Sequence, residues 1–209
     1  MIYKVQFLEK IKFLGNLVSD SVLWSQLRLG DEESFSLLFG RYYSSLVNYG
    51  RTLNSQEETV KDCVQDVFVD VWKNAKRLSD VVFVKAYLFS CVRNRISKIY
   101  ERDHIFSSLN DVDSFDFNFD FSIEDRLISD ETMKAKIENL NKHINNLPSR
   151  QKEALYLRFH QDLSIEQVAE VMNLNYQSTK NLLHRAIIRL RIEFTVPFLA
   201  LIFNYSPNF

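Results

Sequence analysis

The chain has 209 residues, of which 46% are hydrophobic and 25% are charged, so it can bury a core and is not disordered as a whole. It contains only 4 glycines and 3 prolines, which favours long helices with few connections over many short strands. We expect two domains, because helical domains of about 100 residues are common. The net charge is −1, so any nucleic-acid binding would depend on local basic surfaces.

Residues that carry enzymatic chemistry are few and scattered. Cys63 and Cys91 form no CxxC pair and lie at apolar helical positions, so we expect small core residues in a reducing cytoplasm. None of the histidines has metal-ligand spacing with another: His104, His143, His160 and His184. Motifs of phosphate-binding loops and hydrolase nucleophiles are also absent. We therefore expect no enzymatic activity, metal, cofactor or small-molecule substrate.

The apolar segments are too short or too interrupted for membrane insertion. Charged residues interrupt the segment 1–18, which lacks the apolar core of a signal peptide. Residues 196–203 are apolar, but a span needs about 20 such residues. These observations predict a cytoplasmic protein.

Four or five helices are predicted in the first half of the chain, and three of them have clear sequence signals. The first begins at Asp31 and ends before Gly50, with apolar residues at three- and four-residue intervals. Ser55 and Glu58 have the spacing of a capping box that opens the second helix. The core stripe of this helix consists of Val60, Cys63, Val64, Val67, Phe68, Val71, Ala75 and Leu78. A third helix is expected over residues 81–102.

Two surfaces of these helices have unusual charge. Three aspartates recur at helical spacing opposite the core stripe of the second helix, together with one glutamine and one valine. We call this surface the acidic face: Asp62, Gln65, Asp66, Val69 and Asp70. Such a face suits a basic partner, although it could also be an ordinary solvated surface. The third helix has a net charge of +4 and carries aromatic residues, a combination that suits unpaired bases and phosphates as well as an ordinary basic surface.

An acidic segment separates the two halves. Residues 103–131 contain nine acidic residues and one basic residue and show no helical periodicity. We expect an extended or poorly ordered, flexible linker, whose charge could be functional or could only keep the segment soluble.

The second half begins with a predicted helix that carries apolar residues from Met133 to Leu147, followed by a further helix after Pro148. A helix-turn-helix motif comes next. Ser164 and Gln167 have capping-box spacing, Asn173 suits a left-handed turn residue, and Asn175 can cap the second helix.

The second helix of this motif, residues 176–191, has four basic residues and no acidic residue. In DNA-binding helix-turn-helix proteins the corresponding helix enters the major groove with its N-terminal end. The candidate DNA contacts are Tyr176, Gln177, Ser178, Lys180, Asn181, His184 and Arg185. An ordinary helical hairpin with a solvated basic face is the alternative.

Four segments resemble, in the same order, the bacterial sigma factors of the two-domain, extracytoplasmic-function type within the sigma-70 family. GDEESFSLLFGRYY resembles the opening helix, and DCVQDVFVDVWKNAKRL the helix that docks on the polymerase clamp helices. VKAYLFSCVRNRISKIYER resembles the segment that melts and reads the −10 element. The stretch from Leu147 to Arg191 resembles the domain that reads the −35 element.

The resemblance implies an all-α protein with two helical domains, at residues 23–102 and 133–192, joined by the acidic flexible linker 103–132. It places four residues on core RNA polymerase: Asp62, Gln65, Asp66 and Asp70. Four others would lie at the −10 DNA: Arg93 and Asn94 at the exposed bases, and Arg95 and Lys98 on the backbone. Tyr87 and Asn173 stand where the family often has tryptophan and glycine, and residues 1–22 and 193–209 match no part of the pattern.

The expected function is promoter-specific transcription initiation, with core RNA polymerase and promoter DNA as partners and an anti-sigma factor as a possible third. One alternative is a stand-alone helix-turn-helix regulator that dimerises on duplex DNA without polymerase. Another is an interaction adaptor that uses both basic helices to bind proteins. For residues 193–209 we expect packing on the second domain, with regulator docking as the alternative.

Overall fold

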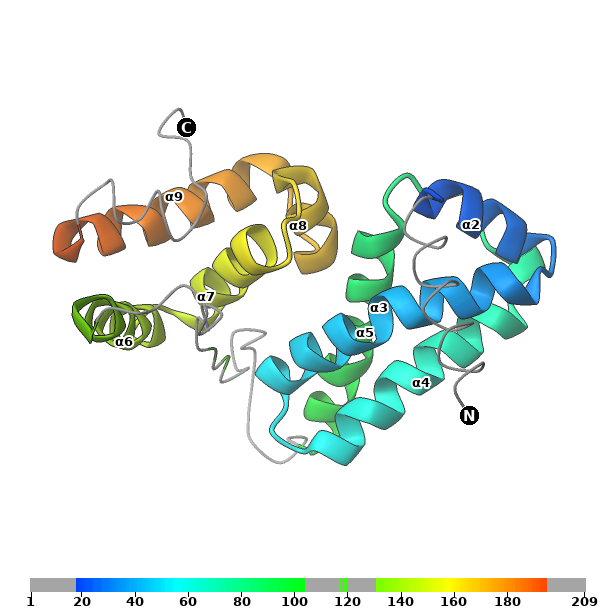
Figure 1. The fold of residues 1–209 in the computed structure, drawn as a ribbon, viewed down its shortest axis with the longest axis horizontal. Helices are drawn as coiled ribbons and strands as arrows, with labels where there is room; N and C mark the ends of the chain where they lie inside the picture. The colour runs from blue at the N-terminus through cyan, green and yellow to red at the C-terminus, as the bar shows by residue number, and fades with distance from the viewer. Residues whose placement is uncertain (1–17, 104–116, 118, 120–130, 195–209) are drawn as a thin grey trace. The chain divides into compact units, whose positions relative to one another are not determined.

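The structure is a computed structural model that describes residues 18–103, 117, 119 and 131–194. These residues form helices and connecting turns and contain no β-strand, which confirms the predicted all-α fold class (Figure 1). The chain divides into two units, Met1–Ser107 and Ser108–Phe209, and each is described by itself below.

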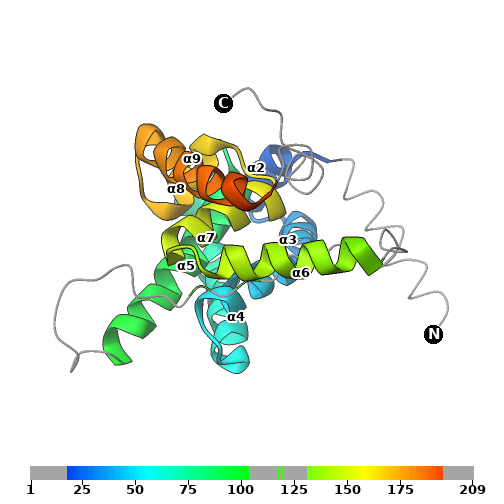
Figure 2. The same ribbon diagram turned by 90° about the vertical axis from the view of Figure 1, so that its left-hand side faces the viewer.

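The first unit packs four α-helices around one core: α2 (Asp20–Arg28), α3 (Glu32–Leu53), α4 (Glu57–Lys73) and α5 (Val84–Asp103), with a short 3₁₀ turn, η1 (Ala75–Arg77), after α4. Helix α3 lies beside α4, and α5 packs against both (Figures 1 and 2). Large side chains from each helix are fully buried between them, among them Trp24, Leu46, Val64 and Phe89.

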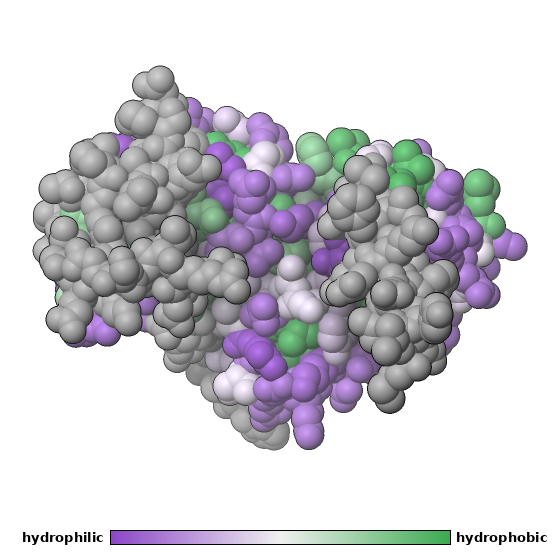
Figure 3. All heavy atoms as spheres, in the orientation of Figure 1, coloured by the Kyte–Doolittle hydropathy of each residue, from purple (hydrophilic) through white to green (hydrophobic). Residues whose placement is uncertain are grey.

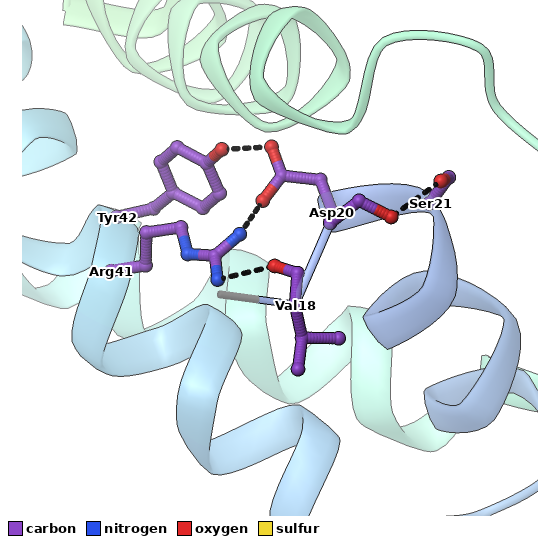
Figure 4. Close-up of polar contacts among 6 residues, drawn as sticks. Val18, Asp20, Ser21, Arg41 and Tyr42 are labelled. Carbon is purple, nitrogen blue, oxygen red and sulfur yellow. Dashed lines mark hydrogen bonds and ion pairs between the residues drawn. The ribbon is translucent and has the colours of Figure 1, made fainter. Parts of the chain in front are cut away.

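Polar contacts fix the start of α2 on α3 (Figure 4). The Asp20 carboxylate accepts hydrogen bonds from Arg41 and from the Tyr42 hydroxyl, while Arg41 also donates to the Val18 carbonyl at 2.9 Å. Burial and the Asp20 carboxylate raise the pKa of Tyr42 well above its usual range. Tyr42 therefore stays protonated as a hydrogen-bond donor, and α2 is tied to the rest of the unit.

Helix α3 begins as predicted, because the Asp31 carboxylate accepts from the Ser34 amide at 2.8 Å. Its predicted end before Gly50 is wrong, since the helix continues to Leu53. A Cβ at Gly50 would lie 2.5 Å from Cγ1 of Val60 and 3.2 Å from Cδ1 of Ile96. This glycine allows helices to approach closely and does not end one.

The predicted capping box at Ser55 is also wrong. The amide oxygen of Asn54 accepts from the Gln56 amide at 2.8 Å, and α4 begins one residue later than a Ser55 cap would require. Glu57 instead pairs with Arg51 at 2.5 Å and with Lys61 at 2.6 Å. Helix α5 begins at Val84, three residues after the predicted start.

The second unit contains α6 (Glu131–Asn145), α7 (Ser149–Leu155), a π-helical turn, η3 (Tyr156–His160), α8 (Ile165–Met172) and α9 (Tyr176–Glu193). Helix α9 contacts α6, α7 and α8. The predicted stripe of α9 is buried at Thr179, Leu183, Ala186, Ile187 and Leu190, and half-buried at Leu182.

The predicted capping signals of the helix-turn-helix are confirmed. Ser164 accepts from the Gln167 amide at 3.2 Å, and the Gln167 side chain accepts from the Ser164 amide at 2.8 Å. Asn173 has a left-handed conformation with φ 51° and ψ 50°. The Asn175 side chain accepts from the Ser178 amide at 2.7 Å, which caps α9.

Most of the predicted linker, 103–132, lies outside the described residues, as do residues 1–17 and 195–209. Phe117 and Phe119 of the linker are described, and both are buried, at 1% and 6% exposure. Their ring centroids lie 5.7 Å and 4.7 Å from that of Tyr156. These two linker residues therefore pack on the second unit.

Candidate polymerase and DNA interfaces

The charged and polar residues of the acidic face lie on the exposed side of α4. Asp62, Gln65, Asp66 and Asp70 are all exposed, and Val69 among them is 44% exposed. The predicted core stripe lies on the opposite side of α4 and is buried from Val60 to Val71. The predicted helix ran too far, since α4 ends at Lys73: the buried Ala75 lies in η1, and the half-buried Leu78 follows it. The helical pattern therefore assigned both sides of α4 correctly.

A surface groove of about 990 Å³ lies between α4 and α5 and is lined by residues of both helices. Its α4 wall includes Asp62, Asp66 and Asp70, and its α5 wall includes Asn94, Arg95 and Lys98. The groove thus has an acidic and a basic wall and brings together residues predicted for polymerase with residues predicted for DNA.

One arginine connects the two walls. Nη1 of Arg95 lies 2.8 Å from Oδ2 of Asp70, and Nη2 lies 2.8 Å from Oδ2 of Asp66. The three side chains are 36%, 59% and 57% exposed, respectively. Sequence analysis did not foresee this contact, because the residues lie 25 and 29 positions apart and on different helices.

The four residues predicted at the −10 DNA do not share one surface. Asn94 and Lys98 are exposed and line the groove with Arg95, whereas Arg93 is only 5% exposed. Two helical positions correspond to about 200°, so Arg93 and Arg95 lie on nearly opposite sides of α5. A contact between Arg93 and DNA would require its side chain to leave this buried position.

Further groove residues were not predicted as site residues. Cys63, Tyr87 and Cys91 lie in its lining, and Arg102 extends it towards the end of α5. Burial raises the pKa of Tyr87 to about 12, with Cys91 contributing, and burial also raises the pKa of the Cys63 thiol. The Tyr87 hydroxyl and the Cys63 thiol are therefore uncharged at neutral pH. Helical spacing from Arg95 could have placed Cys91 and Arg102 on the same side of α5.

The candidate DNA residues of α9 form an exposed row at its N-terminal half. Nε2 of Gln177 donates to Oδ1 of Asn181 at 3.0 Å, and Nε of Arg185 donates to the Asn181 carbonyl at 3.3 Å. Residues one turn apart therefore stack on one side of the helix. The exposed candidates are Tyr176, Gln177, Ser178, Asn181, His184 and Arg185, and Lys180 is half-buried.

The described surface gives no indication of a metal site or a membrane segment. Within the described residues, no group of three or more His, Cys, Asp or Glu side chains could hold a metal ion, and no helix is long and apolar enough to cross a membrane. Where atoms are coloured, Figure 3 shows mostly hydrophilic residues with some hydrophobic patches. Among the described residues, the large hydrophobic side chains that are exposed are Val22, Leu29, Val69, Val82, Phe83, Tyr176 and Ile188.

Comparison with known proteins matches both units to one family. Residues 38–104 match the model of sigma-70 region 2, and residues 137–190 match that of sigma-70 region 4. The RNA polymerase sigma factor YlaC of Bacillus subtilis is 24% identical over 165 residues, which cover 78% of this chain and 93% of that protein.

Two solved structures share the fold at 19% identity. CnrH, solved with the cytosolic domain of CnrY, has a TM-score of 0.56 over 83% of this chain and 96% of that one. The sigma factor RpoE of Bartonella quintana, solved with the anti-sigma factor NepR, has a TM-score of 0.53 over 78% and 98%. The solved structures show a shared fold. The ordered matches to sigma-70 regions 2 and 4, which together cover more than half of the chain, and the sigma-factor relatives show that the chain belongs to the sigma-70 family and is of the extracytoplasmic-function type.

Proposed function

We propose that this chain binds core RNA polymerase and directs promoter-specific transcription initiation. The observation that carries the proposal is the presence of regions 2 and 4 in order on one chain, the second with a fully capped helix-turn-helix. The chain itself catalyses nothing, because phosphodiester chemistry belongs to the polymerase. Its place of action is the cytoplasm, where bacterial polymerase works.

Polymerase docking is assigned to the acidic face of α4. Asp62 and Gln65 are exposed, and Asp62 makes no ion pair with any residue that the structure describes. Unpaired carboxylates on a rigid helix attract a basic partner surface and fix its register. The first domain, proposed as residues 23–102, would thereby attach the chain to the enzyme.

The −35 element is assigned to the exposed row of α9. Amide side chains such as Gln177 and Asn181 can pair with adenine edges, whereas Arg185 and Lys180 suit guanine or phosphate. Tyr176, Ser178 and His184 complete the proposed contact set. This function belongs to the second unit, proposed as residues 133–192.

The −10 element is assigned to the basic wall of the groove. Asn94 and Lys98 are exposed beside Arg95, which suits a strand whose backbone is neutralised while its bases are bound. Arg93 stays in the proposed set through the resemblance alone, since its side chain is buried. Through the resemblance, the acidic linker 103–132 is proposed to thread through the polymerase near the RNA path, where its negative charge can mimic RNA.

An anti-sigma factor is proposed as a further partner, because the Bartonella relative was solved bound to one. The main alternative function is a stand-alone helix-turn-helix regulator. It predicts tight, sequence-selective binding to duplex DNA in the absence of polymerase, with a dimeric protein on palindromic sites.

Co-purification with bacterial core RNA polymerase tests the proposal, followed by promoter-directed transcription with the reconstituted enzyme. Asp62→Arg should abolish stoichiometric binding without altering the fold, because it places a like charge against the basic partner. Asp62 is a cleaner position than Asp66, whose substitution also breaks the Arg95 ion pair. A wild-type chain that does not bind core enzyme, with no anti-sigma factor present, would refute the sigma-factor assignment.

Promoter selection has its own test. Gln177→Ala together with Asn181→Ala should cost about 1–3 kcal/mol of discrimination for each lost base contact. Polymerase binding serves as the control and should not change. Unaltered −35 preference in the double variant would contradict the assignment of α9 as the recognition helix.

A further inference from the structure

One side chain of the basic wall, Arg95 of α5, contacts the acidic face of α4. Arg95 uses two different guanidinium nitrogens for two carboxylates that lie one helical turn apart on α4, Asp66 and Asp70. The planar fork of arginine makes this double contact possible, whereas a lysine ammonium behaves as a single point charge. The two acidic residues are therefore already partly neutralised within the protein.

This neutralisation is uneven along α4. Asp62 is exposed, lies one turn before Asp66, and makes no ion pair with another described residue. Asp66 and Asp70 carry two formal negative charges, one of which Arg95 balances. A basic partner that docks on the acidic face would meet full charge at Asp62 and reduced charge at the other two carboxylates.

We propose that Arg95 competes with the polymerase for Asp66 and Asp70, so that polymerase docking releases Arg95 to promoter DNA. The proposal rests on the proposed function, since it takes α4 as the polymerase surface and α5 as the DNA surface. A phosphate that takes the two N–H groups pointing at Asp66 and Asp70 displaces both contacts to α4. Once a partner cation takes these carboxylates, the freed guanidinium lies in the groove wall beside Asn94 and Lys98.

The exposure of the three side chains makes such an exchange feasible. Arg95 is 36% exposed and the two carboxylates are 57% and 59% exposed, so a partner can reach them without unfolding the unit. Exposed ion pairs are weak, and their loss is readily offset by new contacts. Because binding linkage is reciprocal, DNA that captures Arg95 would also strengthen polymerase docking.

The test measures the affinity of the full chain for core RNA polymerase by equilibrium titration of a fluorescently labelled sample. Arg95→Gln should bind the polymerase about three- to fivefold more tightly, since two exposed ion pairs no longer compete. A purely structural role for Arg95 would instead weaken binding, so the gain is diagnostic. Single-stranded −10 DNA should bind more weakly to the enzyme assembled with this variant.

Two further variants sharpen the comparison. Lys142→Gln removes one positive charge from an exposed residue of α6 that makes no ion pair with a described residue and lies outside the proposed binding surfaces, so it should leave the affinity unchanged. Arg95→Lys retains the charge but loses the double contact, so it should give a smaller gain than Arg95→Gln. It also keeps the proposal testable if Arg95→Gln does not fold.

The outcomes distinguish a failure of the proposed function from a failure of the competition by Arg95. A wild-type chain that fails to bind polymerase overturns the proposed function and the competition with it. A wild-type chain that binds, with folded Arg95→Gln and Arg95→Lys variants that bind no more tightly, overturns the competition alone. Tighter binding by Arg95→Gln and not by Lys142→Gln supports it.

Discussion

Two glycines of α3 offer a matched test of how closely this helix must pack against its neighbours. A Cβ at Gly50 would lie 2.5 Å from Cγ1 of Val60, whereas a Cβ at Gly40 would have no neighbour within 4 Å. Both positions lie inside the same helix. Alanine at either should gain the helix propensity that glycine lacks, and only alanine at Gly50 should collide with another side chain.

The expected magnitudes follow from these two contributions. Gly40→Ala should raise the free energy of unfolding by about 1 kcal/mol, the usual difference between alanine and glycine within a helix. Gly50→Ala gains the same amount but loses about 1–3 kcal/mol to overpacking. Val60 is fully buried and β-branched, so its methyl group cannot rotate away cheaply. Gly50→Ala should therefore be less stable than Gly40→Ala by about 1–3 kcal/mol.

Urea unfolding followed by tryptophan fluorescence measures this difference in the full chain. Both tryptophans, Trp24 and Trp72, belong to the first unit, so the signal reports on that unit alone. Val60→Ala in the Gly50→Ala background should reduce the penalty by removing the obstructing methyl group. Equal stabilisation by Gly50→Ala and Gly40→Ala would refute the close-packing argument.

Three other predictions concern single residues. Asn175→Ala should cost the second unit about 1 kcal/mol, measured by circular dichroism, because the Ser178 amide loses its cap; an unchanged melting temperature would contradict this. Cys63 should react more slowly than Cys91 with a thiol reagent at pH 8, because burial raises its pKa; equal rates in the folded protein would contradict it. Lys61 and Arg51 lower the pKa of Glu57 in the folded protein, so the ionised Glu57 stabilises the fold at pH values above its unfolded-state pKa. This stabilisation is lost as the pH falls through the folded-state pKa. Glu57→Gln should therefore make stability fall less steeply at acid pH, and an unchanged acid dependence would refute this.

The sequence predicted features that depend on residues close together in the chain. The capping box at Ser164, the left-handed Asn173 and the core stripe of α4 each follow from spacing within one turn or one helix, and all are confirmed. Two of the wrong boundaries arose where a local signal had a competing use. Gly50 fits a helix end, but the close approach of Val60 explains it, and Ser55 lost its cap position to an Asn54 turn.

The site was predictable in the same uneven way. Helical periodicity correctly placed Asp66 and Asp70 on the exposed side of α4, since it needs only the positions along one helix. It could not reveal that Arg95 binds both, because that contact depends on the rotation and separation of two helices. Arg93 shows the same limit, since the resemblance places it at the −10 DNA whereas packing buries its side chain.

This difference affects how charged helix faces should be interpreted in a two-partner protein. An acidic stripe beside a basic helix can be two partner surfaces, an internal ion-pair network, or both in turn. In this chain the exposed Asp62 and the paired Asp66 and Asp70 lie on one helix. The same surface therefore contains one carboxylate without an ion pair to a described residue and two carboxylates paired with Arg95. Substitution of Asp62 therefore reports on partner binding alone, whereas substitution of Asp66 or Asp70 also changes the charge that Arg95 presents to DNA. The two effects can be separated only when Arg95 is varied as well.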